Sequence, residues 1–296
     1  MKLGLPSGKY VVAVSGGVDS MVLLDMLSKL SGVDLIVAHF NHGIRDDSDK
    51  DEVLVVRAAK KYGLPVEIGK GGLGKSTSEE LARNARYKFL KDLKTKHSAE
   101  AIVTAHHQDD MIETAIINIL RGTGRRGLTS IAQNPDVLRP LINTPKSEII
   151  TYAKDHRLEW HEDETNLDTK YLRNYIRLKI VPKLTNTQRK QMLANIEDLN
   201  KVNPLLDKEI ATLSQLIVNK NGIDRQKFTN LPPEIANEVL VQYLRENGIR
   251  QFDKKIIERL AIAVKTAKPG TSHDVQKGAV IEISRNFALL RQGVRA

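Results

Sequence analysis

The 296-residue sequence contains no cysteine. It can therefore form no disulfide, no thiolate-ligated zinc or iron–sulfur centre, and no thiol nucleophile. Enzymes that pass sulfur through a protein thiol are excluded by this absence. Aromatic residues are also scarce, at 4% of the chain, which disfavours stacking platforms for single-stranded nucleic acid in its C-terminal part.

Long apolar runs are absent as well. No segment approaches the ~20 apolar residues that a membrane-spanning helix requires, and the N-terminus lacks the apolar core of a signal peptide. We therefore expect a cytoplasmic protein without a membrane partner. Basic residues, in contrast, are abundant: a net charge of +10 and a pI near 9.6 favour a polyanionic partner such as nucleic acid.

The first half of the chain alternates short β-branched runs with helical patterns. Strands are predicted over residues 10–14, 35–39, 64–68 and 101–105. Helices are predicted over residues 20–30, 49–62, 78–96 and 109–121. This alternation predicts an α/β domain in which a parallel sheet carries helices on both faces. Ligands of such sheets bind beyond the carboxyl ends of the strands, so the chemistry should follow Val14, Val37 and Ala105.

From residue 187 the pattern changes. A long amphipathic pattern over 190–218 predicts a linking helix, and it is followed by predicted helices over 232–247 and 253–265 and a hairpin over 275–291. We therefore divide the chain into a catalytic domain (1–186), a linker helix (187–218) and a small α+β accessory domain (219–296).

Two glycine-rich loops compete as phosphate-binding sites. The first lies between a predicted strand and a predicted helix and consists of Ser15, Gly16, Gly17, Val18, Asp19 and Ser20. Its glycines allow the backbone to approach phosphates, and the helix N-terminus offers N–H groups to an anion. Asp19 would repel that anion unless it caps the helix or binds Mg²⁺.

The second candidate, residues 69–76, matches the G-x-x-x-x-G-K-[ST] motif of P-loop NTPases. The sequence offers no apolar strand ending in aspartate that could hold magnesium as a Walker B carboxylate. The following helix also begins later, after capping candidates at residues 76–78. We interpret this segment as a surface loop and keep a P-loop NTPase as an alternative function.

The first loop resembles the pyrophosphate-binding loop of the N-type ATP pyrophosphatases, or PP-loop superfamily, whose members adenylate a substrate. Later segments resemble successive blocks of one of its families, tRNA(Ile)-lysidine synthetase, and occur in the order of that family. They are AHFNHGIR (38–45), EELARNARY (79–87), TAHHQDDMIET (104–114), RGTG (121–124), RPL (139–141), WHEDETN (160–166) and RNYIR (173–177). The chain departs from the family pattern at Met111, where glutamine is common, which puts a polar role at that position in doubt.

The resemblance implies a PP-loop fold and a two-step, AMP-forming ligation. ATP, used with Mg²⁺, adenylates the wobble cytidine of tRNA(Ile) with a CAU anticodon and pyrophosphate leaves. Free lysine then displaces AMP at carbon 2 of the base to give lysidine, with no permanent cofactor. The resemblance implies a short form of this family, with one accessory domain that binds tRNA. A homodimer is one assembly that the sequence allows. Another adenylating ligase acting on a small molecule is the alternative within the superfamily.

The carboxylates after the fourth predicted strand are the strongest catalytic candidates. Asp110 and Glu113 are three residues apart, so they share one helix face and could hold a lysine ammonium and accept its proton. Charges that merely stabilise a helix N-terminus are the alternative, which accounts well for Asp109. By resemblance, Arg173 binds the carboxylate of lysine, a task that suits a planar guanidinium. Asp19 completes the predicted catalytic set.

The resemblance also suggests the remaining contacts. Besides the loop, it places Ala38, His39 and Asn41 near ATP. Basic residues predicted to contact tRNA, with surface ion pairs as the alternative, are Arg83, Arg86, Arg121, Arg125, Arg126 and Arg177. The histidines that end predicted strands are as well explained by caps or buried hydrogen bonds, and none is assigned as the general base.

Overall fold

The computed structural model describes residues 3–41, 43, 48–71, 79–131, 134, 136–162, 167–249 and 252–293. Its contacts divide the chain into two compact units. The first comprises Met1–Ile117 and Thr129–Ala194, and the second comprises Asn118–Leu128 and Asn195–Ala296. The chain therefore crosses between units inside two helices, α4 (Gln108–Leu120) and α8 (Asn186–Ile217). The sequence-based division at residue 186 does not anticipate that 118–128 belongs to the second unit.

The first unit is built on a parallel five-stranded sheet, which confirms the predicted fold class. Its strands are β1 (Gly8–Ala13), β2 (Val33–Asn41), β3 (Val66–Lys70), β4 (Ala101–Val103) and β5 (Val137–Leu138). They are ordered β3-β2-β1-β4-β5, and every neighbouring pair is parallel. In the central register, Val12 of β1 lies opposite Val37 of β2 and Val103 of β4.

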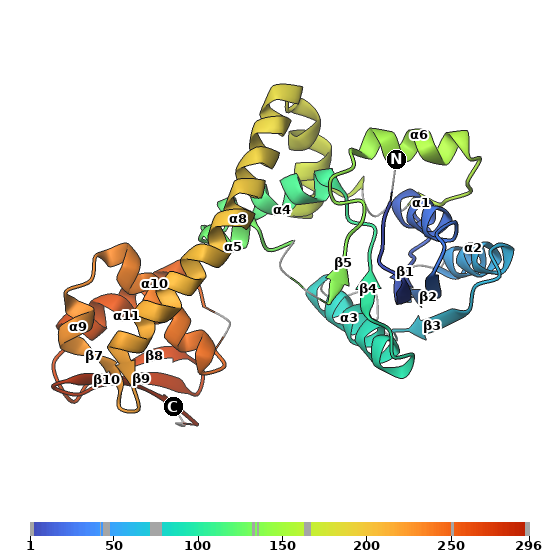
Figure 1. The fold of residues 1–296 in the computed structure, drawn as a ribbon. Coiled ribbons are helices and arrows are strands. Elements are labelled where there is room, and N and C mark those ends of the chain that lie inside the picture. The colour runs from blue at the N-terminus through green and yellow to red at the C-terminus, as the bar shows by residue number, and fades with distance from the viewer. Residues whose placement is uncertain are drawn as a thin grey trace. The chain divides into compact units, whose positions relative to one another are not determined.

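Helices cover both faces of this sheet because its central strands are apolar on both sides. Tyr10 and Val12 of β1 pack into a core with α1 (Val18–Leu27), α2 (Ser48–Lys61) and α6 (Lys146–Asp155). Val11 points the other way, since side chains alternate along a strand, and packs with Leu90 of α3 (Glu79–Lys96). Figure 1 shows α1 and α6 on one side of the sheet and α3 on the other.

A buried carboxylate fixes the helix that follows the first loop. Asp25 of α1 accepts hydrogen bonds from Lys29 Nζ at 2.6 Å, Tyr152 Oη at 2.7 Å and Tyr62 Oη at 2.8 Å. Burial opposes its ionisation, but these three donors hold the pKa of Asp25 below its usual range. Tyr152 belongs to α6 and Tyr62 follows α2, so Asp25 joins three helices on the face of the sheet that carries the loop.

The second unit is an α+β module, as predicted. Its antiparallel sheet has the order β6-β7-β10-β9-β8, formed by β6 (Val218–Asn219), β7 (Gly222–Asp224), β8 (Ser272–Gln276), β9 (Ala279–Ile283) and β10 (Phe287–Gln292). The predicted hairpin corresponds to β9 and β10. Figure 1 shows α10 (Pro233–Glu246) and α11 (Lys254–Thr266) over one face of this sheet, and the short α9 (Arg225–Thr229) follows β7.

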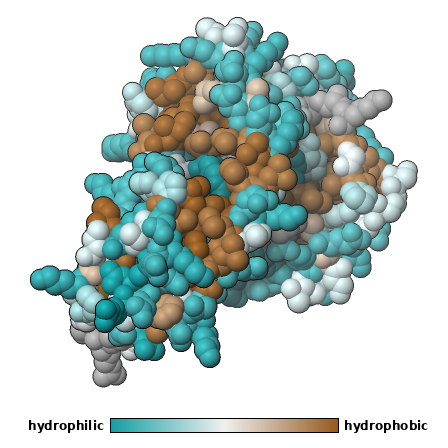
Figure 2. All heavy atoms as spheres, turned by 60° about the vertical axis from the view of Figure 1, so that its left-hand side comes forward, coloured by the Kyte–Doolittle hydropathy of each residue, from teal (hydrophilic) through white to brown (hydrophobic). Residues whose placement is uncertain are grey.

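The surface is mostly hydrophilic with apolar patches, as Figure 2 shows for one face. Large apolar side chains exposed in the second unit include Leu120, Leu205 and Leu216. Within the described ranges, no helix combines the length and the apolar character needed to cross a membrane.

Candidate active site

The predicted phosphate loop joins β1 to α1 at the carboxyl edge of the parallel sheet. Gly16 adopts φ +95°, a left-handed conformation that favours glycine. The hydroxyl of Ser20 donates to the Gly17 carbonyl at 2.9 Å and accepts the Ser15 N–H at 3.1 Å, which closes the loop. Helix α1 begins at Val18 without a side-chain cap. The N–H groups of its first turn are therefore not taken by a capping side chain and suit an anion.

A lysine from α6 compensates the acidic residue in this loop. Lys146 Nζ donates to Asp19 Oδ1 at 2.5 Å, although the two residues lie 127 positions apart. The negative charge of Asp19 is thereby offset beside the predicted phosphate site. Lys146 could not be predicted as a site residue, because a lysine after Pro145 at the start of a helix is also typical of surface lysines.

The two predicted catalytic carboxylates are buried on α4 and meet the predicted arginines. Glu113 accepts hydrogen bonds from Arg177 Nε at 2.7 Å, Arg177 Nη2 at 2.9 Å and Arg173 Nε at 3.2 Å. Arg177 Nη2 also lies 3.2 Å from Asp110 Oδ1. Burial opposes ionisation of Asp110, but His107, His106, the His107 backbone N–H and Arg177 keep its pKa below its usual range.

Both arginines come from a short irregular helical segment. Arg173 lies in α7 (Leu172–Tyr175), and Arg177 lies in the π-helical turn Ile176–Ile180 that continues it. Such turns are often found at functional sites. The structure places Arg177 on the same carboxylate as Arg173, so its contacts favour a role beside the predicted catalytic carboxylates over the predicted role in tRNA binding.

His107 lies between the loop and the carboxylates. Its Nε2 is 3.7 Å from Asp19 Oδ1 and 3.5 Å from Asp110 Oδ2. A continuous series of charged and polar groups, the charged chain, thus runs through the first unit and consists of Lys146, Asp19, His107, Asp110, Arg177 and Glu113. The neighbouring His106 differs, because burial lowers its pKa to about 4 and keeps it neutral near pH 7.

The predicted nucleotide contacts at the end of β2 are buried. His39 Nδ1 donates to the Val14 carbonyl at 2.9 Å, and His39 Nε2 has no hydrogen-bond partner among the described residues. The Asn41 amide bonds to Asp49 at 3.1 Å. Ala38 pairs in the sheet and offers no polar side chain. The Asn41 side chain therefore holds the end of β2 in place through local hydrogen bonds. Within this group, His39 Nε2 is the buried polar atom that could form a hydrogen bond with a ligand.

Arginines gather near the end of β4. Arg83 and Arg86 of α3 lie 5.0 and 5.7 Å from the centre of the Tyr87 ring. Both, together with Arg139 after β5, disfavour a charged His106 and reinforce the effect of its burial on that pKa. Arg139 Nη1 donates to a β5 carbonyl at 2.9 Å, and its buried Nε has no partner among the described residues. Arg139 was not a predicted site residue, although it belongs to one of the family-like segments.

Three of the arginines predicted to contact tRNA lie at the end of α4 or just after it. Arg125 and Arg126 lie in a short helix, α5 (Arg125–Leu128), within the second unit. Arg125 Nη2 pairs with Asp207 at 2.5 Å and with Glu238 at 3.1 Å, and Arg126 Nη2 pairs with Asp207 at 2.6 Å. Both guanidiniums are partly buried against these carboxylates, so their geometry favours a structural role over contact with RNA phosphate. Arg121 is exposed.

The described part of the competing glycine loop has a packing role. A side chain at Gly69 would meet Phe40 at 2.7 Å and Phe89 at 2.8 Å, so glycine there allows close packing. Residues 72–76 of that candidate, like residues 163–166 of the WHEDETN segment, lie outside the described residues. Across the described ranges, no three His, Asp or Glu side chains are grouped so as to hold a metal ion.

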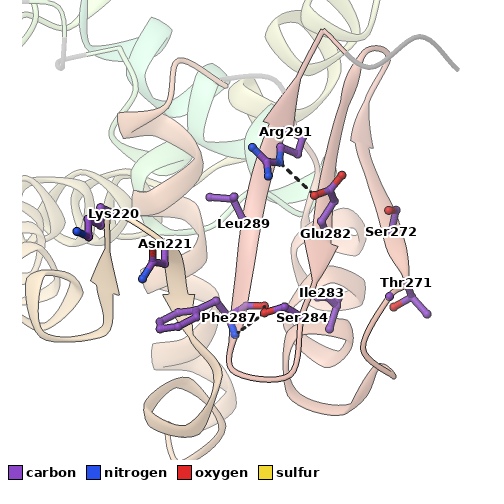
Figure 3. A pocket seen from close by; sticks show the side chains of 11 residues that line it. Lys220, Asn221, Thr271, Ser272, Glu282, Ile283, Ser284, Phe287, Leu289 and Arg291 are labelled. Carbon is purple, nitrogen blue, oxygen red and sulfur yellow. Dashed lines mark hydrogen bonds and ion pairs between the residues drawn. The ribbon is translucent and has the colours of Figure 1, made fainter.

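The second unit contains a cavity of about 440 Å³ on its sheet. Figure 3 shows Lys220, Asn221 and Phe287 at one side of it and the ion pair between Arg291 and Glu282, 3.1 Å long, at the other. Its lining mixes polar and charged side chains with the apolar Ile283, Phe287 and Leu289.

Comparison with known proteins gives matches over most of the chain. A family model described as the PP-loop domain matches residues 3–184. The tRNA(Ile)-lysidine synthase of Thermotoga sp. (strain RQ2) is 39% identical over 206 residues, covering 66% of this chain and 48% of that protein. The enzyme of the same name from Nitrosomonas europaea is 32% identical over 283 residues, with 89% and 60% covered. That from Bacteroides thetaiotaomicron is 34% identical over 299 residues, with 97% and 68% covered. The chain thus spans about half the length of the Thermotoga relative.

Proposed function

Because this chain belongs to the tRNA(Ile)-lysidine synthase family and carries its ATP-using PP-loop domain, we propose that it ligates free lysine to tRNA. The substrate is the wobble cytidine of tRNA(Ile) with a CAU anticodon, and the product is lysidine. The observation that carries this proposal is the charged chain. It joins a phosphate loop to a buried pair of carboxylates within one unit, so a nucleotide and an ammonium would bind side by side.

In the first step, ATP activates the base. Oxygen 2 of the cytosine attacks the α-phosphorus of ATP, and pyrophosphate leaves from the loop at the N-terminus of α1. Lys146, now paired with Asp19, is placed to donate to the phosphates as well. Asp19 is a partly exposed carboxylate of the kind that binds Mg²⁺ together with phosphate oxygens, and the ion would neutralise phosphate charge there.

In the second step, lysine displaces AMP. Asp110 and Glu113 hold the ammonium and accept a proton, since only the neutral amine is a nucleophile. The amine attacks carbon 2 of the base, and AMP leaves with the former oxygen 2. Arg177 contacts both carboxylates, so the incoming ammonium shares them with this guanidinium. Arg173, at the edge of the same cluster, binds the lysine carboxylate.

The tRNA is held mainly through charge. Residues 219–296 contain 14 lysines and arginines against 8 aspartates and glutamates, a surplus of six that is more than half of the net charge of +10. The second unit, including the surface around Lys220 and Arg291, therefore suits the phosphates of an RNA stem. Arg83, Arg86 and Arg121 would extend the contact. A homodimer and a cytoplasmic location complete the proposal, and exposed Leu205 is the kind of residue that a dimer interface would bury.

One assay tests the proposal directly. The full chain is incubated with ATP, labelled lysine and a tRNA transcript bearing the CAU anticodon, beside a transcript in which the wobble cytidine is replaced by uridine. We expect label only in the first transcript, with AMP and pyrophosphate as products. Label in a small molecule, or release of inorganic phosphate without label in RNA, contradicts the proposal.

Two substitutions sharpen this assay. Asp110→Asn removes a carboxylate that would take the amine proton, so ligation should be lost while the Kd for ATP stays within about threefold. Lys75→Ala should leave ligation intact, whereas a P-loop NTPase would lose its activity with that lysine.

A further inference from the structure

One ring nitrogen of His107 accepts a backbone hydrogen bond, and the other lies near two carboxylates. The residue is buried immediately before α4, and its Nδ1 accepts the backbone N–H of Asp109 at 3.2 Å. A ring nitrogen that accepts a hydrogen bond carries no proton, so the proton of the neutral ring is on Nε2. The nitrogen that carries this proton lies 3.5 Å from Asp110 Oδ2 and 3.7 Å from Asp19 Oδ1.

The two carboxylates that face His107 serve different halves of the proposed reaction. Asp19 belongs to the ATP loop, and Asp110 belongs to the helix that would hold lysine. Both oxygens lie within 3.7 Å of the same nitrogen, so they are at most about 7 Å apart and repel each other. The same two oxygens also accept other hydrogen bonds, Asp19 Oδ1 from Lys146 and Asp110 Oδ2 from the His107 backbone N–H at 2.9 Å.

Both contacts of Nε2 are longer than a good hydrogen bond. A small rotation of the ring or a small shift of one carboxylate would shorten one contact and lengthen the other. Hydrogen bonds of this kind often tighten only when substrate is bound. Any ligand that moves Asp19 therefore changes the hydrogen bonding of Asp110.

We propose that His107 is a positioning residue that couples the ATP loop to the lysine carboxylates, an inference that rests on the proposed ligation. When ATP with Mg²⁺ occupies the loop and Asp19 turns towards the ion, the Nε2 donor passes to Asp110 and holds this carboxylate beside Glu113. Lysine then binds more tightly after ATP than before it. Such coupling favours activation of the base before the nucleophile arrives.

Two matched variants separate coupling from a structural role. Asparagine at 107 keeps an oxygen where Nδ1 accepts the Asp109 N–H but has no donor at the Nε2 position. Glutamine places an amide N–H near the Nε2 position but loses the acceptor. Coupling predicts that His107→Gln keeps the effect of ATP on lysine binding and His107→Asn loses it. A residue that only caps α4 would give the opposite order.

The measurement is the Kd for lysine, by calorimetry on the full chain in buffer containing Mg²⁺, with and without a non-hydrolysable ATP analogue. We expect the analogue to lower the Kd roughly tenfold in the native chain, by a similar factor in His107→Gln, and not at all in His107→Asn. In ligation assays, His107→Asn should raise the KM for lysine more than it lowers kcat. No effect of the analogue in the native chain, or His107→Asn behaving better than His107→Gln, overturns the inference.

The native protein offers a second test that does not depend on the folding of His107 variants. Nitrogen NMR of histidine-labelled protein should show His107 as the Nε2–H tautomer, with a proton resonance that shifts in both Asp19→Asn and Asp110→Asn. An Nδ1–H tautomer, or a resonance insensitive to either substitution, contradicts the coupling. If the native chain transfers no lysine to tRNA, the proposed function fails first. Intact ligation with the reverse order of the two variants refutes the coupling alone.

Discussion

Replacement of Glu113 by glutamine should destabilise the first unit as well as abolish ligation. The Glu113 side chain is only 1% exposed, yet it accepts three hydrogen bonds from two guanidiniums. Glutamine has nearly the same shape but carries no charge, and its amide N–H₂ faces arginine donors that it cannot satisfy. Glu113→Gln therefore tests the electrostatic contribution of this site with little change in packing.

The size of the effect follows from the exposure of the partners. Removal of one partner of a buried ion pair costs about 3–5 kcal/mol. Arg173 and Arg177 are 27% and 34% exposed, so both recover part of their hydration and the cost should be near the lower limit. For a unit of this size, about 3 kcal/mol corresponds to a fall in Tm of roughly 6–12 °C.

The only tryptophan of the chain makes this measurement specific. Trp160 packs against the core of the first unit, so its fluorescence during urea or thermal unfolding reports that unit. Asp92→Asn is the control, because its pair with Lys88 is 2.9 Å long but 63% and 80% exposed. Such a surface pair contributes less than about 1 kcal/mol. Equal midpoints for Glu113→Gln and Asp92→Asn would refute the reasoning, since the buried carboxylate would then contribute no more than a surface one.

Three further predictions concern other ion pairs. Lys146→Ala should raise the KM for ATP about tenfold in tRNA-dependent pyrophosphate exchange, whereas Lys154→Ala on the same helix should leave it unchanged. The pKa of Asp25 is lowered in the folded chain, so its contribution is complete above its ordinary pKa of about 4 and is lost as pH falls through the lower folded value. Acid titrations followed by Trp160 fluorescence should therefore show a smaller loss of stability below pH 4 in Asp25→Asn than in the native chain. An equal loss in both proteins would show that other groups cause the acid sensitivity. Asp207→Asn should lower the stability of the second unit by about 2 kcal/mol and increase hydrogen exchange in α5 while Trp160 reports no change, and unaltered exchange in α5 would contradict that expectation.

Much of the first unit can be predicted from the sequence because its strands are buried on both faces. A strand that is buried on both faces is recognisable in the sequence as a short apolar run. The first four strands are also separated by helices of regular length. The two-residue strand β5 has no such signal, since Val137 and Leu138 form a strand only because β4 offers them partners. Strands β6 and β7, of two and three residues, likewise depend on their partners, because β6 pairs with β7 and β7 pairs with β10.

Apart from the family resemblance, which suggests Asp19 and Arg173, residues of the candidate site could be grouped from the sequence only where they lie close together in the chain. Asp110 and Glu113 are one helical turn apart, and a local motif contains both. The partners of Asp19 could not be inferred, because Lys146 is 127 positions away and no local pattern distinguishes it from a surface lysine. Separation in sequence also explains why the ion pairs of the α5 arginines could not be predicted. The carboxylates that pair with them lie roughly 80 to 113 positions later, so the sequence does not distinguish a paired guanidinium from a solvated one.

The crossing of the chain inside α4 and α8 bears on how this protein can be divided. A fragment that ends after residue 186 retains Arg125 and Arg126 but discards Asp207 and Glu238, with which they pair. The complementary fragment keeps two carboxylates and lacks their cations. Recombination with a homologue should therefore succeed when residues 118–128 travel together with the C-terminal segment, and a chimaera joined at one point near residue 186 should inherit mismatched partners.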